Sequence, residues 1–316
     1  MNDIPREASE SVRRVLAFLN RSGAPKLHEL APAAARQLFE TLAPALDMPA
    51  PAVGRVEERM IPGGGGPCPA RIFWPKDPPD GALPLVVFLH GGGFVIGSSR
   101  VYARVTGHLA NAAGAVVVSL DYRLAPEHPF PAAVEDAFAA TKWAADTARK
   151  LGADPARLVV AGDSAGGNLA AVTALLARDA GSPTLAGQVL LYPVTDMASV
   201  RPSFEAYGEG LFLERETMRW FAGAYVPDPT SRADWRVSPL RAPDHRGLPP
   251  AYVLTAGLDP LRDEGEAYAK KLAAAGVAVT RRRWEGLIHG FLNMGGVAPE
   301  ARAALDDIAA WVRDLC

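Results

Sequence analysis

Apolar residues alternate between short continuous runs and longer amphipathic segments from residue 85 to the end of the chain. The continuous runs predict buried strands at 85–89, 116–120, 158–161, 189–192, 251–255 and 277–284. The segments between them predict helices near 102–112, 132–150, 166–177, 265–275 and 300–315. Fully apolar strands joined by crossover helices form a mostly parallel sheet that is covered on both faces. The pattern therefore predicts an α/β fold.

The first 50 residues have a different pattern. Apolar side chains recur at helical spacing over 9–19 and 33–43, ahead of any strand. Pro44, Pro49 and Pro51 then interrupt the pattern. Alternating positions predict two strands at 53–60 and 70–74, joined by a mobile glycine-rich hairpin connection over 62–69. We therefore expect a helical arm over 1–50, followed by one α/β domain over 51–316.

A second departure lies between Asp196 and Ser238, where no strand is predicted. This segment is long for a plain connection, and it is rich in large apolar and aromatic side chains. We interpret about 197–238 as an insertion that packs over the sheet. Some of its aromatic residues could line an apolar pocket, but most are expected to form the insertion's own core.

One strand runs directly into the sequence GDSAG, at residues 162–166, and then into a helical pattern. A serine at such a tight strand-to-helix turn, with small residues two positions before and after it, is typical of a nucleophile elbow. The following helix directs its free amides toward the place where negative charge would develop. Ser164 is therefore the candidate nucleophile, although an ordinary turn can have the same sequence.

A run of three glycines follows the strand at 85–89, within the sequence HGGGF at residues 90–94. Glycines after a buried strand allow the backbone to approach a ligand and to turn its amides inward, as an oxyanion hole requires. The run does not end in Gly-Lys-Ser/Thr and does not open a helix as Gly-x-Gly-x-x-Gly, so it does not favour nucleotide binding.

In combination, these motifs resemble those of the hormone-sensitive lipase group of α/β-hydrolase carboxylesterases (bacterial family IV). The matching segments, in the family's order, are HGGGF at 90–94, DYRLAPEHPFP at 121–131, GDSAGG at 162–167, DPLRD at 259–263 and HGF at 289–291. The resemblance implies an α/β-hydrolase fold with a helical cap. It also implies that the arm and the insertion form that cap over the catalytic domain, although the arm could equally be a packing element that never meets substrate.

A serine hydroxyl needs a base within hydrogen-bond reach and an acid that orients the base. His289 follows the last predicted strand and comes last in the Ser-Asp-His order of this fold, which favours it over the other histidines. Asp259, Asp196 and Asp263 all follow predicted strands and are candidate acids. The resemblance favours Asp259, because it begins the DPLRD motif, then Asp196, then Asp263.

The resemblance implies hydrolysis of short- to medium-chain carboxylic esters through an acyl-enzyme on Ser164, with backbone amides of Gly92, Gly93 and Ala165 as the oxyanion hole. No metal or organic cofactor is expected, because the chemistry needs none and the histidine and cysteine spacings predict no zinc site. Asp163, and the motif residues Tyr122, Arg123 and Glu127, are expected to brace the active-site loops.

Composition limits the partners. The chain has 316 residues, a formal net charge of −2 and 22% charged residues, which gives no electrostatic reason for binding nucleic acid or an anionic membrane. No long apolar run or basic leader occurs, and the two cysteines, Cys68 and Cys316, have no metal or redox spacing. We expect a cytoplasmic enzyme that acts on a small-molecule ester, as a monomer or as a homodimer, with Arg281 to Arg283 protecting or pairing a sheet edge.

Two alternatives remain on the same scaffold. One is a different acyl-transfer reaction, such as amide, lactone or deacetylation hydrolysis, which would use the same three residues. The other is a non-catalytic small-molecule receptor, since the gibberellin receptors are similar to this family but lack the histidine. The presence of His289 in this chain argues against a receptor.

Overall fold

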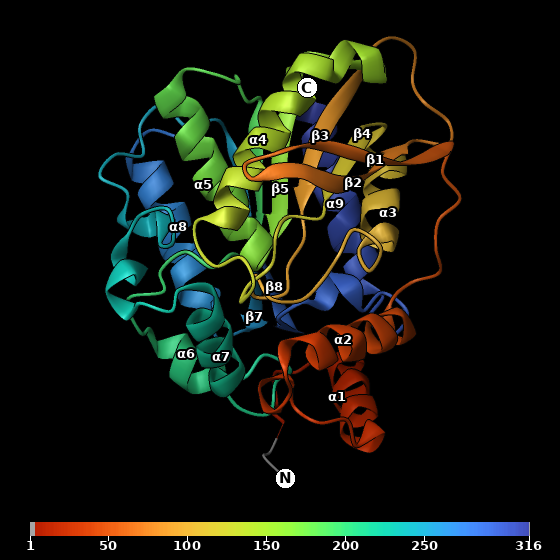
Figure 1. The fold of residues 1–316 in the computed structure, drawn as a ribbon. Helices are drawn as coiled ribbons and strands as arrows, with labels where there is room; N and C mark the ends of the chain where they lie inside the picture. The colour runs from red at the N-terminus through yellow and green to blue at the C-terminus, as the bar shows by residue number, and fades with distance from the viewer. Residues whose placement is uncertain (1–3, 316) are drawn as a thin grey trace.

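A computed structural model describes residues 4–315 as a layered α/β domain built on one twisted sheet (Figure 1). The sheet has the strand order β1-β2-β4-β3-β5-β6-β7-β8. The β1–β2 and β2–β4 pairs are antiparallel, and all the other pairs are parallel. The strands are β1 (Arg55–Gly63), β2 (Gly66–Trp74), β3 (Leu83–Leu89), β4 (Val116–Leu120), β5 (Ala153–Asp163), β6 (Gly187–Leu191), β7 (Ala251–Leu258) and β8 (Val279–Ile288).

Helices cover both faces of the sheet, which confirms the predicted α/β class. One core packs the sheet against α4 (Ala132–Thr147), α5 (Ala165–Ala180) and α8 (Arg262–Ala274). The other packs it against α3 (Ala103–Ala113) and α9 (Glu300–Leu315). Every residue of β3, β4, β6 and β7 is buried, because such strands are covered on both sides.

The parallel register aligns the ends of the central strands. Leu89 of β3 lies opposite Gly162 of β5, and Gly162 lies opposite Leu190 of β6. Leu190 in turn lies opposite Val253 of β7. Loops that leave these carboxyl ends therefore emerge side by side, which is where open α/β sheets bind ligands.

The glycine-rich connection differs from the prediction. The β1 strand continues to Gly63 and β2 begins at Gly66, so only Gly64 and Gly65 form the turn. The amide of Gly64 donates to Oδ1 of Asp136 at 2.8 Å, and a Cβ added to Gly65 would lie 2.2 Å from the Arg123 guanidinium. The turn packs against α4 and against the ion pair of Arg123 with Asp136. Glycine is therefore required there because a side chain would collide with these groups.

The N-terminal arm and the insertion lie at the same end of the molecule (Figure 1). The arm consists of α1 (Glu10–Ser22), a 3₁₀ turn (Leu27–Glu29) and α2 (Pro32–Leu46), and the insertion contains α6 (Pro202–Tyr207) and α7 (Arg215–Tyr225). The two segments contact each other: Lys26 pairs with Glu214 at 2.7 Å, and Nδ1 of His28 lies 2.9 Å from the Thr217 hydroxyl. Arg36 of α2 also pairs with Glu127 of the main domain.

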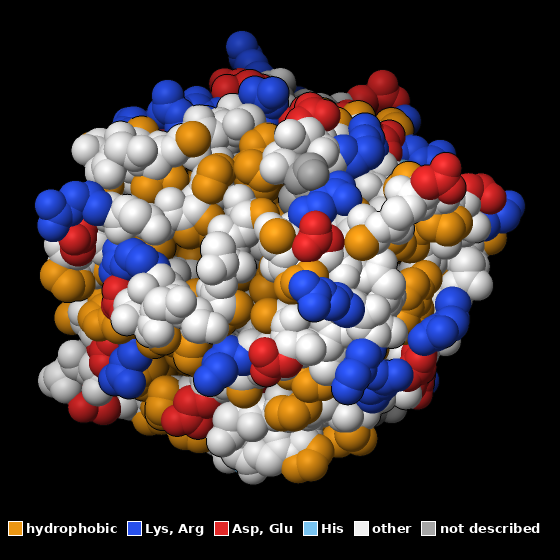
Figure 2. Space-filling view, turned by 90° about the horizontal axis from the view of Figure 1, so that it is seen from above, with side chains coloured by type: hydrophobic (Ala, Val, Ile, Leu, Met, Phe, Trp, Pro, Cys, Tyr) orange, Lys and Arg blue, Asp and Glu red, His pale blue; other side chains and the backbone are white. Residues whose placement is uncertain are grey.

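The opposite end of the molecule has a mixed surface. Figure 2 shows this face, on which basic and acidic side chains are interspersed among scattered apolar ones.

At the β8 edge, Arg282 pairs with Asp307 and Arg283 with Glu266. Within residues 4–315, no helix is long and apolar enough to cross a membrane. Cys68 is a buried free thiol, and Cys316 lies outside the described residues.

Candidate active site

Ser164 lies between the end of β5 and the start of α5, with φ 54° and ψ −117°. A non-glycine residue with positive φ is uncommon and costs free energy, so the surrounding structure must hold it there. A Cβ on Gly162 would lie 2.2 Å from the Gly166 carbonyl oxygen, and one on Gly166 would lie 1.9 Å from that of Leu89. The turn is therefore as tight as its sequence predicts.

His289 follows β8 and lies between the serine and an acid. Its Nε2 is 2.9 Å from Oγ of Ser164, and its Nδ1 is 2.8 Å from Oδ2 of Asp259. A carboxylate oxygen accepts hydrogen bonds, so this contact favours the tautomer with the proton on Nδ1. Nε2 is then free to accept the serine proton.

Asp259 follows β7 and is fully buried. Its Oδ1 accepts the backbone amide of Leu261 at 2.8 Å, while Oδ2 faces His289. Both oxygens thus have fixed partners, which determines the orientation of the carboxylate and through it the orientation of the imidazole.

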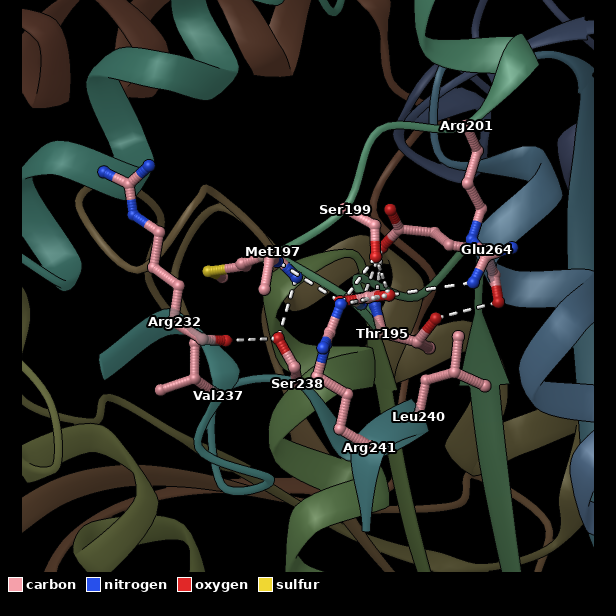
Figure 3. Close-up of polar contacts among 12 residues, drawn as sticks. Thr195, Met197, Ser199, Arg201, Arg232, Val237, Ser238, Leu240, Arg241 and Glu264 are labelled. Carbon is pink, nitrogen blue, oxygen red and sulfur yellow. Dashed lines mark hydrogen bonds and ion pairs between the residues drawn. The ribbon is translucent and has the colours of Figure 1, made fainter. Parts of the chain in front are cut away.

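The other two candidate acids have cationic and hydroxyl partners instead of a histidine. Asp196 accepts from Arg241 Nε at 2.7 Å and from the Ser199 hydroxyl at 2.5 Å. Figure 3 shows Ser199 and Arg241 within one cluster of polar contacts. Asp263 accepts the Ser203 amide and pairs with Arg262. Hydrogen bonds to these donors lower the pKa of both carboxyls, against the effect of burial.

The remaining histidines with recorded contacts lie elsewhere. His108 faces Asp306, and His245 bonds the Pro239 carbonyl. His90 donates from Nδ1 to the Gly91 carbonyl and stacks on Tyr122 at 4.3 Å between ring centroids. The Tyr122 hydroxyl also donates to the His90 carbonyl, at 2.7 Å. This pair braces the glycine loop, a role that the sequence predicted for Tyr122.

Two glycines of the loop line the cavity that contains the serine. Gly92 and Gly93 line the same cavity as Ser164 and have φ of 114° and 60°. In the described part of the chain, neither amide has a recorded protein acceptor. Ala165 is the first residue of α5, so its amide has no acceptor within the helix. A Cβ on Gly93 would lie 2.1 Å from the Phe221 ring, so this position requires glycine.

Asp163 connects the elbow to the glycine loop. Its Oδ1 accepts the Gly91 amide at 2.7 Å, and its Oδ2 accepts the Tyr102 hydroxyl at 2.9 Å. Burial raises the pKa of this carboxyl to about 6. The sequence predicted a bracing role for Asp163, but it did not identify Tyr102, because no motif or spacing links that residue to the elbow.

A cavity of about 710 Å³ opens onto Ser164 and His289. Side chains of the arm line it, including Leu16, Leu38 and Leu42. The sequence had left open whether the arm meets the site. From the insertion, the apolar lining residues are Met197, Val200, Phe204, Phe212, Leu213, Met218 and Phe221, whereas Tyr225 is buried and stacks on Phe94.

No group of three or more histidine, cysteine, aspartate or glutamate side chains is arranged to hold a metal ion within residues 4–315. The polar groups that the site itself provides are a hydroxyl, an imidazole, a carboxylate and backbone amides without a recorded protein acceptor in the described residues. These are the groups that acyl transfer requires.

Known proteins with similar sequences include esterases. Residues 86–293 match the family described as alpha/beta hydrolase fold. Esterase LipI of Mycobacterium tuberculosis is 45% identical over 256 residues, which cover 79% of each chain. An ethyl acetate hydrolase of Pseudomonas putida is 42% identical over 245 residues, which cover 76% of each chain.

The fold is shared with solved structures as well. An alpha/beta hydrolase enzyme from the metagenome of Lake Arreo, Spain, superposes with a TM-score of 0.95 at 41% identity. The match covers 98% of this chain and 99% of the other, so it includes the arm and the insertion.

Proposed function

This chain belongs to the α/β-hydrolase superfamily, in its hormone-sensitive-lipase-like group of carboxylic ester hydrolases, and we propose that it works through a Ser164-His289-Asp259 triad. The observation that carries the proposal is the continuous hydrogen-bonded line from Ser164 Oγ through both ring nitrogens of His289 to Asp259. A hydroxyl, a base and an orienting acid in this arrangement form the minimum unit of nucleophilic acyl transfer.

In the first half of the reaction, Oγ of Ser164 attacks the ester carbonyl carbon while Nε2 of His289 takes the hydroxyl proton. Asp259 holds the tautomer and stabilises the imidazolium that forms. The amides of Gly92, Gly93 and Ala165 donate to the developing oxyanion. When the tetrahedral intermediate collapses, the ester C–O bond breaks, His289 returns its proton to the alcohol, and an acyl-serine remains.

In the second half, His289 takes a proton from water as the water oxygen attacks the acyl-serine. The same amides hold the second oxyanion. Collapse of this intermediate breaks the bond to Oγ, His289 returns the proton to Ser164, and the carboxylic acid leaves. One ester and one water therefore give one acid and one alcohol, with the enzyme regenerated.

The proposed substrates are esters with short to medium acyl chains. A volume of about 710 Å³ lies within the range of small-molecule pockets, and apolar side chains from both segments above the sheet line much of it. In this proposal, the arm over 1–50 and the insertion over about 197–238 form the cap, and the apolar side chains that it contributes to the cavity limit acyl length.

The experiment is hydrolysis of p-nitrophenyl esters of graded acyl length by the wild type, Ser164→Ala and His289→Ala. We expect wild-type turnover that is highest with short or medium chains and falls by on the order of 10⁴–10⁶ in both variants. Ser199→Ala is a matched control, because this serine lines the same cavity but bonds Asp196 instead of a histidine.

Three outcomes would contradict parts of the proposal. Full activity of Ser164→Ala would exclude this serine as nucleophile. Equal turnover at every acyl length would contradict a size-limiting cap. A folded wild type that cleaves amides or lactones but no ester would replace ester hydrolysis by a different acyl transfer at the same site.

A further inference from the structure

Among residues 4–315, one charged side chain that lines the cavity above Ser164 has no recorded partner. Besides His289, seven acidic and basic residues line the cavity, and six of them have protein partners. The seventh is Arg232, in the 3₁₀ turn Pro229–Ala233 of the insertion. In the described part of the chain, its side chain has no recorded hydrogen bond or ion pair, and its Nε is buried without an acceptor.

The other two cations of the cavity are paired. Lys26 lies 2.7 Å from Glu214, which itself lines the cavity, and Arg219 pairs with Glu216 on the same helix. Neither therefore leaves a free positive charge at the site.

The other three carboxylates of the cavity also have donors. Asp163 accepts from the Gly91 amide and the Tyr102 hydroxyl. Asp196 pairs with Arg241 at 2.7 Å. Glu264 accepts the Thr195 amide at 2.6 Å. No acidic side chain of the cavity is thus left to neutralise Arg232.

Acids near Arg232 in the sequence bond other groups. Asp228 accepts from Thr230, and Asp234 forms a two-point pair with Arg236. Figure 3 shows the Arg232 side chain pointing away from the polar cluster of Ser199 and Arg241, with a contact drawn only to its carbonyl oxygen. A buried polar group without a partner calls for an explanation, and a ligand group is one.

The backbone that carries Arg232 is fixed relative to the nucleophile. The buried Ser238 hydroxyl donates to the Arg232 carbonyl at 2.6 Å and accepts the Met197 amide at 2.8 Å. Nδ2 of Asn168, in the first turn of α5 behind Ser164, donates to the carbonyls of Val194 and Val237. Because the backbone at Arg232 is already ordered, substrate binding has to order only the Arg232 side chain, which favours its use in orienting a substrate.

We propose that Arg232 is a specificity-determining residue that binds a carboxylate carried by the ester substrate. A guanidinium presents a planar pair of N–H donors that matches a carboxylate, and within a cavity such a contact is stronger than in water. The substrate class is therefore esters with a second, anionic end, located on either the acyl or the alcohol portion. This inference rests on the proposed ester hydrolysis at Ser164.

The test compares anionic and neutral esters of equal chain length, with acid release followed by pH-stat. For the acyl portion, monoethyl esters of glutarate, adipate and pimelate are compared with the ethyl esters of the matching monocarboxylic acids. For the alcohol portion, the acetate ester of γ-hydroxybutyrate is compared with butyl acetate. The enzymes are the wild type, Arg232→Gln, Arg232→Lys and Arg219→Gln, whose arginine lines the same cavity but is already paired.

We expect Arg232→Gln to lower the anionic-to-neutral ratio of kcat/KM by about tenfold or more on one of the two portions, mainly through KM. Arg232→Lys should keep part of the ratio, and Arg219→Gln should leave it unchanged. A ratio that stays within about twofold of the wild type on both portions would overturn the proposal, since a charged contact is worth more than that.

Failure of the Arg232 proposal can be distinguished from failure of the proposed ester hydrolysis. If the wild type cleaves the neutral esters but the ratio does not respond to Arg232, this inference fails while the ester hydrolysis stands; if it cleaves no ester, the proposed function fails. Should the Arg232 variants not fold, the wild type alone decides. Salt should then lower kcat/KM for the anionic ester and spare the neutral one, and an equal response would contradict the proposal.

Discussion

Asp196 and Asp259 follow neighbouring parallel strands, β6 and β7, and both are buried at the same edge of the sheet. Their partners differ. Asp259 faces the imidazole of His289, whereas Asp196 faces the guanidinium of Arg241. An arginine stays charged at every relevant pH, so it can only compensate the carboxylate, whereas a histidine can gain and lose a proton.

The comparison shows that location at a strand end does not by itself give a carboxylate its role. Asp196 is held by the charge of Arg241. Asp196 precedes the insertion and Arg241 follows it, so this ion pair joins the two ends of the insertion. Asp259 is held by a backbone amide and leaves its second oxygen to the histidine. The first arrangement favours stability, and the second permits proton transfer.

The strongest way to break the comparison is Asp259→Asn. We expect kcat for ester hydrolysis to fall by on the order of 10⁴, because the amide no longer selects the tautomer that accepts the serine proton. Thermal unfolding followed by circular dichroism should show that the variant is folded. Asp263→Asn is the matched control, because Asp263 bonds Ser203 and Arg262 and no histidine. A larger loss in the control would reverse the assignment.

The reciprocal change, Asp196→Asn, should act mainly on stability. Loss of the charged acceptor leaves Arg241 and Arg201 without their carboxylate, which we expect to cost about 1–3 kcal/mol of unfolding free energy. The value of kcat should change by less than about tenfold, since Asp196 does not touch the histidine. Chemical denaturation and steady-state kinetics measure the two effects. A loss in kcat as large as that of Asp259→Asn would show that the two carboxylates act together.

Glu264 lies close to both Asp196 and Asp259, and its titration makes the stability of this part of the fold depend on pH. Burial raises the pKa of this carboxyl from its ordinary value of 4.5 to about 8. Between these values the folded state keeps a proton that the unfolded state has released, so the Glu264 contribution to stability falls as pH rises.

Glu264→Gln removes this titration while keeping an oxygen that can accept the Thr195 amide. The melting temperature of the variant, relative to wild type, should therefore rise by at least about 2 °C between pH 5 and pH 8. The difference between the two proteins isolates Glu264 from Asp163, whose pKa is also raised, to about 6. Parallel melting curves across this range would contradict the assignment.

Ser199→Ala gives the smallest expected effect. Its hydroxyl donates to Asp196 and accepts from Arg241, but the side chain is exposed, so water can replace both contacts. We expect a loss of about 0.5 kcal/mol in unfolding free energy and no change in kcat. A loss above about 2 kcal/mol would mean that the cluster around Asp196 acts as one cooperative network.

The sequence alone determined the features that depend on local chemistry. The apolar runs indicated the buried strands, because a strand covered on both faces has no polar side to alternate with. Gly162 and Gly166 indicated the elbow, because a Cβ at either position would collide with backbone. The glycines after β3 indicated a loop whose amides can turn inward, and His289 was singled out by its place after the last strand.

Only the tertiary structure decided the features that depend on facing groups far apart in the chain. Position after a strand did not distinguish Asp196, Asp259 and Asp263, and only the family resemblance favoured Asp259. Which of the three faces the histidine depends on tertiary packing. The same holds for the arm that lines the cavity. It also holds for Arg232, which has no recorded partner within residues 4–315 once the neighbouring acids are placed. Residue type and spacing set what a side chain can do, and packing sets what it meets.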